Sequence, residues 1–334
     1  MKAWKKAAVT VSMIISMTAM AICANAEGHT SVDAYHDDVK IAVCLYSDSD
    51  NTAIEFIEGF DDVFGKYDNV TYQVFDAAGS TDTQISQLED TIIQGFDAVM
   101  VQATDEEAII TSCQEVMEEG IPLISLNLAP NIGHAVCISC DGQNGGKELA
   151  LQAIEDAGKD SGKWVFLAPP EGALSMKDMP FYGFKTYMDS LSSDWELLEM
   201  QCCDYTTEMG QTVMADMLTK FADIDFAFCA NDEMAEGAAM ACQAAGREEV
   251  NIYGASGSEK MLEYIEKGLC TGTMFVDNVQ AGALAAKFAL YAITSDVDMN
   301  VQSEKRTIYT DYYVVTKENT EDARADLRSW GIME

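Results

Sequence analysis

The chain has 334 residues and a formal net charge of −36, from 20 Lys and Arg against 56 Asp and Glu. A protein this acidic repels phosphate backbones and anionic membrane surfaces, so the composition excludes nucleic-acid binding. Residues 1–26 hold three Lys and no acid, so the rest of the chain is more acidic still. Its length suits two domains of ordinary size.

Residues 1–26 have the pattern of a signal peptide. Three Lys precede a run of apolar or small residues over 7–22, and Ala-Asn-Ala at 24–26 is the small-x-small motif that a signal peptidase reads. The apolar run is shorter than the roughly 20 residues of a membrane-spanning helix. A lipoprotein would need Cys23 as the acylated residue, but a bulky Ile precedes it. We therefore predict cleavage before Glu27 and a soluble periplasmic or extracellular protein.

Nine of the ten cysteines follow the predicted signal peptide. Cys44, Cys137 and Cys229 lie in apolar, strand-like runs, where cysteine behaves as a small hydrophobic residue. Cys137 and Cys140 have CxxC spacing, but on a strand these two side chains point to opposite faces, which disfavours a metal or redox site. We expect core thiols and no disulfide needed for folding.

From residue 40 onward, short apolar runs alternate with segments of helical period. The first half predicts strand 41–46, helix 53–64, strand 70–75, helix 82–94, strand 98–101, helix 106–119 and strands 122–126 and 135–140. The second half predicts helix 148–157, strand 164–167, helix 181–191, strand 196–202, helix 209–221, strand 226–229, helix 234–245, strand 251–254, helix 260–267, strand 272–276, helix 281–293 and strand 307–316.

This alternation predicts an α/β protein with doubly wound parallel sheets, covered by helices on both faces. About nine strand-helix units are more easily accommodated in two sheets than in one. The Gly-rich stretch 141–146 is the predicted join between the two halves. Ligands of such sheets bind beyond the carboxyl ends of the strands. Two facing sheets therefore predict one cleft between two lobes.

Several segments resemble the ribose-type periplasmic sugar-binding proteins, which have the type I periplasmic binding protein fold. The segments are 120–127, 138–147, 228–238 with its Ala-Asn-Asp-Glu-Met-Ala sequence, 253–258, 268–273 and 313–319. The resemblance runs from about residue 40 to residue 319 and implies two lobes joined by three hinge strands. By this analogy one lobe holds 38–140 and 278–305, and the other holds 141–277 and 306–334.

The family's sugar-contacting positions carry over only in part. Its Asp-Arg pair matches Asn127 and Leu128, and its hinge Gln matches Val276 beside Asp277. None of the four Arg in the chain maps to the cleft. The resemblance, followed position by position, implies a ligand site at Asp50, Thr52, Gln102, Asn127, Asp178, Tyr205, Asn231, Ser256 and Asp277.

Such a cleft predicts a neutral or cationic ligand. A buried phosphate or carboxylate would find acids and amides but no Arg, and leaving it unpaired costs several kcal/mol. A sugar or sugar-like compound is the first expectation from the resemblance. An amine-bearing compound or a nucleoside remains an alternative.

Enzymatic signatures are missing from the sequence. His134 lies in a loop with no nucleophile pattern beside it, and we expect it to be solvated. Residues 141–148 lack the leading Gly and closing Ser or Thr of a phosphate loop, and 48–50 lack the rest of a calcium loop. We expect no catalysis, cofactor or metal.

The resemblance implies a monomer that closes over its ligand and docks on the permease of an ABC transporter. A sensory role, in which the closed form meets a chemoreceptor or sensor kinase, remains open. A DNA-binding regulator of the lactose-repressor type shares the core, but the cleavable N-terminus and the acidity exclude it.

Overall fold

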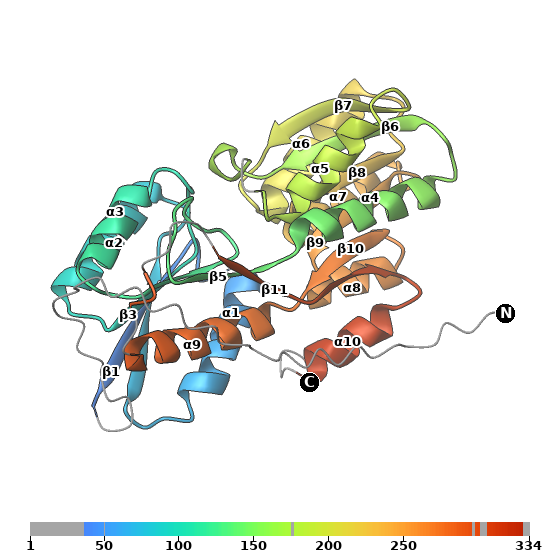
Figure 1. Cartoon of the computed structure of the whole chain (residues 1–334). Helices are drawn as coiled ribbons and strands as arrows, with labels where there is room; N and C mark the ends of the chain where they lie inside the picture. The colour runs from blue at the N-terminus through green and yellow to red at the C-terminus, as the bar shows by residue number, and fades with distance from the viewer. Residues whose placement is uncertain (1–36, 50, 175–176, 296–297, 301–305, 330–334) are drawn as a thin grey trace.

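The computed structural model describes residues 37–49, 51–174, 177–295, 298–300 and 306–329, which form two α/β lobes (Figure 1). The predicted signal peptide lies outside the described residues. Within the described ranges, no helix combines the length and apolar character that crossing a bilayer requires.

The first lobe is built on a six-stranded parallel sheet in the order β11-β5-β4-β3-β1-β2. Its strands are β1 (Val39–Leu45), β2 (Val70–Asp76), β3 (Ala98–Val101), β4 (Leu123–Leu126), β5 (Val136–Cys140) and β11 (Thr307–Thr310). Its helices are α1 (Asn51–Phe64), α2 (Thr81–Ile93), α3 (Ile110–Glu118) and α9 (Asn278–Thr294). Helices α1 and α9 pack together on one face, and α2 and α3 lie on the other (Figure 1).

The second lobe has a six-stranded sheet in the order β12-β10-β9-β8-β6-β7. Its strands are β6 (Gly162–Ala168), β7 (Trp195–Cys202), β8 (Phe226–Cys229), β9 (Asn251–Ser256), β10 (Gly272–Val276) and β12 (Tyr312–Thr316). Its helices are α4 (Gly142–Ala157), the short 3₁₀ helix η1 (Glu171–Ala173), α5 (Pro180–Ser190), α6 (Thr207–Lys220), α7 (Asp232–Ala245), α8 (Glu259–Glu266) and α10 (Thr320–Ser329). Only the pairing of β10 with β12 is antiparallel.

The described chain crosses between the sheets at three places: from β5 to α4, from β10 to α9 and from β11 to β12. The sequence predicted one strand over 307–316 and placed all of it in the second lobe. The structure corrects this, because β11 pairs with β5 in the first sheet and β12 pairs with β10 in the second. The strand breaks at Asp311, which lies in the third crossing.

The Gly-rich join is the first turn of α4 and not an interruption of the helix pattern. Asp141 caps the helix by accepting a hydrogen bond from the Asn144 N–H at 3.2 Å. A Cβ at Gly142 would lie 2.2 Å from the carbonyl oxygen of Asp178, and one at Gly146 would lie 2.0 Å from that of Pro180. The glycines therefore let α4 approach α5 closely.

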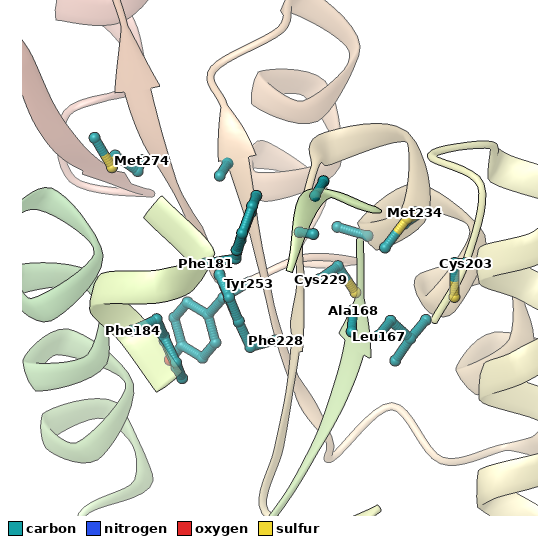
Figure 2. Packing of buried hydrophobic residues seen from close by; sticks show 14 of the residues in the cluster. Leu167, Ala168, Phe181, Phe184, Cys203, Phe228, Cys229, Met234, Tyr253 and Met274 are labelled. Atoms are coloured by element: carbon teal, nitrogen blue, oxygen red, sulfur yellow. The ribbon is translucent and has the colours of Figure 1, made fainter. Parts of the chain in front are cut away.

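Large aromatic side chains fill the core of the second lobe (Figure 2). The rings of Phe184 on α5 and Phe228 on β8 stack with centroids 3.9 Å apart, and Tyr253 on β9 lies beside them. Burial of such side chains on both faces of the sheet is the main stabilising contribution to the lobe.

Thiols occupy the cores of both lobes. All nine cysteines in the described ranges are free, and eight of them are buried. Burial raises the pKa of the Cys113 and Cys140 thiols to about 12, which leaves them protonated and unreactive at neutral pH.

The expectation of a solvated His134 is wrong. The side chain is fully buried, with Nε2 lying 2.6 Å from Ser125 Oγ and Nδ1 lying 2.8 Å from the Ile132 carbonyl oxygen. If Nδ1–H donates to that carbonyl, Nε2 accepts from the Ser125 hydroxyl, as in a neutral imidazole. His134 therefore anchors the loop between β4 and β5.

Candidate functional site

A cavity lies between the two lobes, beyond the carboxyl ends of their strands. The space open to the centre of a water molecule is about 80 Å³. Both lobes contribute to its lining, which consists of Tyr46, Thr52, Gln102, Asn127, Leu128, Cys140, Met179, Pro180, Phe181, Tyr205, Ala230, Asn231, Glu233, Ala255, Ser256, Val276 and Asn278.

On the first-lobe side, a chain of side-chain amides leads into the cavity. Asn127 follows β4, and its Nδ2 donates to Asn278 Oδ1 at 3.2 Å. Asn278 is the first residue of α9, and its Nδ2 donates to Glu55 Oε2 on α1 at 2.8 Å. Asn127 is 8% exposed and Asn278 is 2% exposed, so both amides are held in a nearly water-free setting.

On the second-lobe side, Asn231 and Glu233 act together at the start of α7. Asn231 caps the helix, because its Oδ1 accepts from the Met234 N–H at 3.0 Å. Its Nδ2 donates to the Tyr205 carbonyl oxygen at 3.0 Å and to Glu233 Oε2 at 2.8 Å. The amide thus positions both Tyr205 and the Glu233 carboxylate.

Glu233 also joins the two lobes. Asn51, the first residue of α1, donates from Nδ2 to Glu233 Oε1 at 2.8 Å. Each oxygen of the carboxylate therefore accepts one amide hydrogen bond, one from each lobe. The cross-lobe bond requires the starts of α1 and α7 to lie next to each other, as they do in the structure.

Two aromatic rings, one from each lobe, meet edge to face in the cavity wall. Tyr46 follows β1 in the first lobe and Tyr205 follows β7 in the second, with ring centroids 5.9 Å apart at 87°. Tyr205 has a positive φ of 66°, and the hydrogen bond from Asn231 holds its backbone in place. The residues 179–181 at the start of α5 add an apolar wall. Such surfaces suit the C–H faces of a small polar molecule.

The cavity is acidic and rich in acceptors. Its lining includes one carboxylate, Glu233, and no Lys, Arg or His among the described residues. Burial raises the pKa of Glu233 above its usual range, and the neighbouring Glu236 carboxylate adds to this shift. Deeper in the lobe interface, burial raises the pKa of Glu55 to about 8. A bound cation or hydrogen-bond donor would relieve these costs.

Comparison with known proteins agrees with this geometry. The model of the periplasmic binding protein domain family matches residues 41–296 of the chain. The chain belongs to this family.

Individual relatives of this binding protein cover most of its length. The ribose import binding protein of Bacillus subtilis is 27% identical over 216 residues, which are 65% of this chain and 69% of that protein. A putative rhizopine-binding protein of Rhizobium meliloti is 27% identical over 301 residues, which are 86% and 93% of the two chains.

Among solved structures, an ABC transporter periplasmic solute-binding protein from Actinobacillus succinogenes with bound D-allose is similar to the binding protein. The TM-score is 0.74 and the sequence identity 26%, over 85% of this chain and 100% of that one. The two-lobed type I fold predicted from the sequence is confirmed.

Six of the nine sequence-predicted site residues line the cavity of the binding protein: Thr52, Gln102, Asn127, Tyr205, Asn231 and Ser256. Asp50 lies outside the described residues. The structure does not bring Asp178 and Asp277 into the lining. Asp178 accepts a hydrogen bond from the Tyr309 hydroxyl at 3.3 Å, beside the hinge, and Asp277 caps α9 by accepting from the Gln280 N–H at 2.7 Å.

Sequence reasoning missed Glu233, Asn278, Tyr46 and the supporting Glu55. Glu233 was given no ligand-binding role, although it directly follows the predicted contact residue Asn231 and its neighbour Asp232. Asn278 directly follows Asp277 at the hinge, so a one-residue shift of the carried-over position would have found it. For Glu55, an acid on the buried face of a predicted helix was the available signal.

Among the described residues, no cluster of His, Cys, Asp and Glu has the arrangement of a metal site. The side chains of the cavity are suited to binding by hydrogen bonds and ring faces. Cys140 is the one lining thiol in the described ranges, and burial raises its pKa to about 12.

Proposed function

We propose that the binding protein captures a small, neutral or cationic polyhydroxyl ligand, such as a sugar or polyol, for an ABC transporter. The observation that carries the proposal is the cavity between the lobes, with amide and carboxylate acceptors and no cationic side chain in its described lining. The similarity to proteins named for ribose import and solved with D-allose supports the same ligand class.

The size of the cavity supports a ligand of one ring. A buried water needs about 10–15 Å³ of the same measure of space, so 80 Å³ corresponds to roughly five to eight waters. At about 30 Å³ of liquid volume each, these waters occupy about 150–240 Å³. This volume suits a monosaccharide or cyclic polyol.

Glu233 favours a second candidate within the same function, which is an amine-bearing ligand. An ammonium group beside this carboxylate would form a charge-assisted hydrogen bond and lower the carboxylate's raised pKa. A phosphate or carboxylate ligand would instead meet this negative charge with no cation in the described lining.

Titration calorimetry on the chain beginning at Glu27 tests the ligand class. Ribose, D-allose, myo-inositol and glucosamine represent the expected ligands, and ribose 5-phosphate and galacturonate serve as anionic controls. We expect binding from the first group only. Tight binding of a sugar phosphate or sugar acid would overturn the assignment of the cavity.

Closure of the lobes is the proposed transport signal. The two closing bodies would be residues 38–140 with 278–310 and residues 141–277 with 311–329, a division supported by the sheet pairing of β11 and β12. A ligand stabilises the closed form in proportion to its differential affinity for it, and a permease would recognise that form. Small-angle scattering should show a smaller radius of gyration and a monomer when a binding sugar is added.

Export completes the proposal. The family membership supports an extracytoplasmic location, and the sequence pattern supports cleavage before Glu27. Intact mass of the protein from its native cells should show a start at Glu27 without lipid. A lipidated N-terminal Cys23 would instead make it a surface lipoprotein.

A further inference from the structure

The hydrogen-bonded chain from Glu55 to the cavity has a fixed direction while Glu55 is ionised. An ionised carboxylate only accepts hydrogen bonds, so Asn278 must turn its Nδ2 toward Glu55, as it does at 2.8 Å. The Oδ1 of Asn278 then faces Asn127, which must offer its own Nδ2, as it does at 3.2 Å. The Glu55 carboxylate therefore orients the Asn278 amide, and the Asn278 amide orients that of Asn127.

The last group in this chain has a buried acceptor oxygen without a partner. Asn127 lines the cavity, and its buried Oδ1 accepts no hydrogen bond from the described residues. A buried amide oxygen without a partner costs about 1–3 kcal/mol, a cost that a ligand can remove only by donating a hydrogen bond. A carbonyl or ether oxygen placed there would meet a second acceptor.

We propose that Glu55 in its ionised form, although outside the cavity lining, selects a ligand with a hydrogen-bond donor at this point by orienting Asn278 and Asn127. The inference deepens the proposed function, on whose ligand class it rests. Glu55 is a positioning residue, since it acts through the two amides. It is 5% exposed, so its carboxylate is largely shielded from water.

The protonation state of Glu55 decides whether the hydrogen bonds of Asn278 and Asn127 can reverse their direction. Burial raises the pKa of Glu55 to about 8, and the Asp232, Glu233 and Asp277 carboxylates add to the increase, while the hydrogen bond from Asn278 opposes it. A protonated carboxyl group can donate as well as accept, so the selection is strictest where Glu55 is ionised. Binding is therefore compared at pH 9, after a melting curve has shown that the protein is folded there.

Replacement of Glu55 by Gln removes the constraint. A Gln amide can donate to Asn278 Oδ1, which reverses both Asn side chains and presents Asn127 Nδ2 to the cavity. The matched control is Asp62→Asn, an acid-to-amide change on the exposed face of the same helix α1.

The binding experiment uses myo-inositol and its monoketones, in which one hydroxyl donor becomes an acceptor. We expect wild type and Asp62→Asn to prefer myo-inositol over at least one monoketone by about tenfold, the equivalent of one hydrogen bond of about 1.4 kcal/mol. Glu55→Gln should reduce that preference to about threefold or less. A preference unchanged in Glu55→Gln overturns the inference.

A second measurement needs no ligand, so it separates this inference from the proposed function. In ¹⁵N spectra of the ligand-free wild type, the side-chain amides of Asn278 and Asn127 should shift together in one step with a midpoint near 8. If Asn127 does not follow that step, the amides are not coupled and the inference fails. If the step is present but no inositol binds, the inference on polarity stands and the proposed ligand class is weakened.

Discussion

A substitution of Glu233, which accepts a hydrogen bond from Asn51 in the other lobe, tests how the two lobes are held together around the cavity. In Glu233→Gln, one acceptor oxygen is replaced by an amide NH2 group, which can only donate, yet Asn51 and Asn231 both present amide donors at 2.8 Å. One of the two hydrogen bonds is therefore lost, or is kept only as a weaker neutral bond if one Asn turns its amide around. Because Asn231 is also held by its capping role and by Tyr205, we expect the Asn51 bond across the lobes to break.

The size of the effect follows from these contacts. A hydrogen bond to a charged group contributes about 1.5–3 kcal/mol, and the lower figure applies here because Glu233 is only partly buried. A loss of about 1.4 kcal/mol from the closed form alone weakens ligand affinity about tenfold. An amine-bearing ligand should lose more than a neutral one, since it also loses its counter-charge.

Titration calorimetry with the tightest-binding sugar from the ligand screen measures this change, and Glu208→Gln on the exposed first turn of α6 is the control. Asn51→Ala should weaken binding by a similar factor, and the double variant should be no weaker than either single variant. The reasoning fails if Glu233→Gln binds within twofold of wild type, or if the two effects add.

Three further predictions concern stability. Gly146→Ala should lower the melting temperature by several degrees, because the new Cβ would meet the Pro180 carbonyl oxygen, an overpacking of about 1–3 kcal/mol or more. Gly158→Ala, with no atom within 4 Å of its Cβ but a φ of +60°, should cost only about 1 kcal/mol, and equal losses would contradict the steric argument. Reducing agent should leave the melting temperature unchanged, because all nine described cysteines are free; a fall of many degrees would reveal a disulfide. Stability measured by urea should fall as pH rises from 5 to 8, because the folded state holds a proton on Glu55, with pKa raised from 4.5 to about 8, that the unfolded state has released. Glu55→Gln should show a smaller fall, and an equal fall would assign the effect to other groups.

The architecture could be predicted because local pattern and tertiary structure agree over most of the chain. Strands 98–101, 226–229 and 272–276 match β3, β8 and β10 residue for residue, since short apolar runs between helical segments are the signature of buried parallel strands. Helix α4 begins at Gly142 and not at residue 148. Glycine disfavours helices locally, and only the close approach of α5 explains its presence there.

The split of the last predicted strand also could not be predicted from local sequence. Residues 307–316 have one continuous strand pattern, and nothing local marks Asp311 as the point where the chain changes sheets. Pairing partners far away in the sequence decide it, because β11 meets β5 and β12 meets β10. Helix α10 was not predicted, as its buried face is formed by only a few apolar residues.

For the site, the sequence by itself determined which strand ends line the cavity and the lack of an Arg there to hold an anion. These follow from chain order and composition, which local reasoning can read. The tertiary structure alone decided that Glu233 reaches Asn51 in the other lobe, and that Glu55 lies behind Asn278 and Asn127. The residues of these contacts are 182, 223 and 151 positions apart. Such distances are closed only by tertiary packing within the first lobe and between the lobes, so hydrogen-bond direction at the cavity is a property of the fold and not of any local motif.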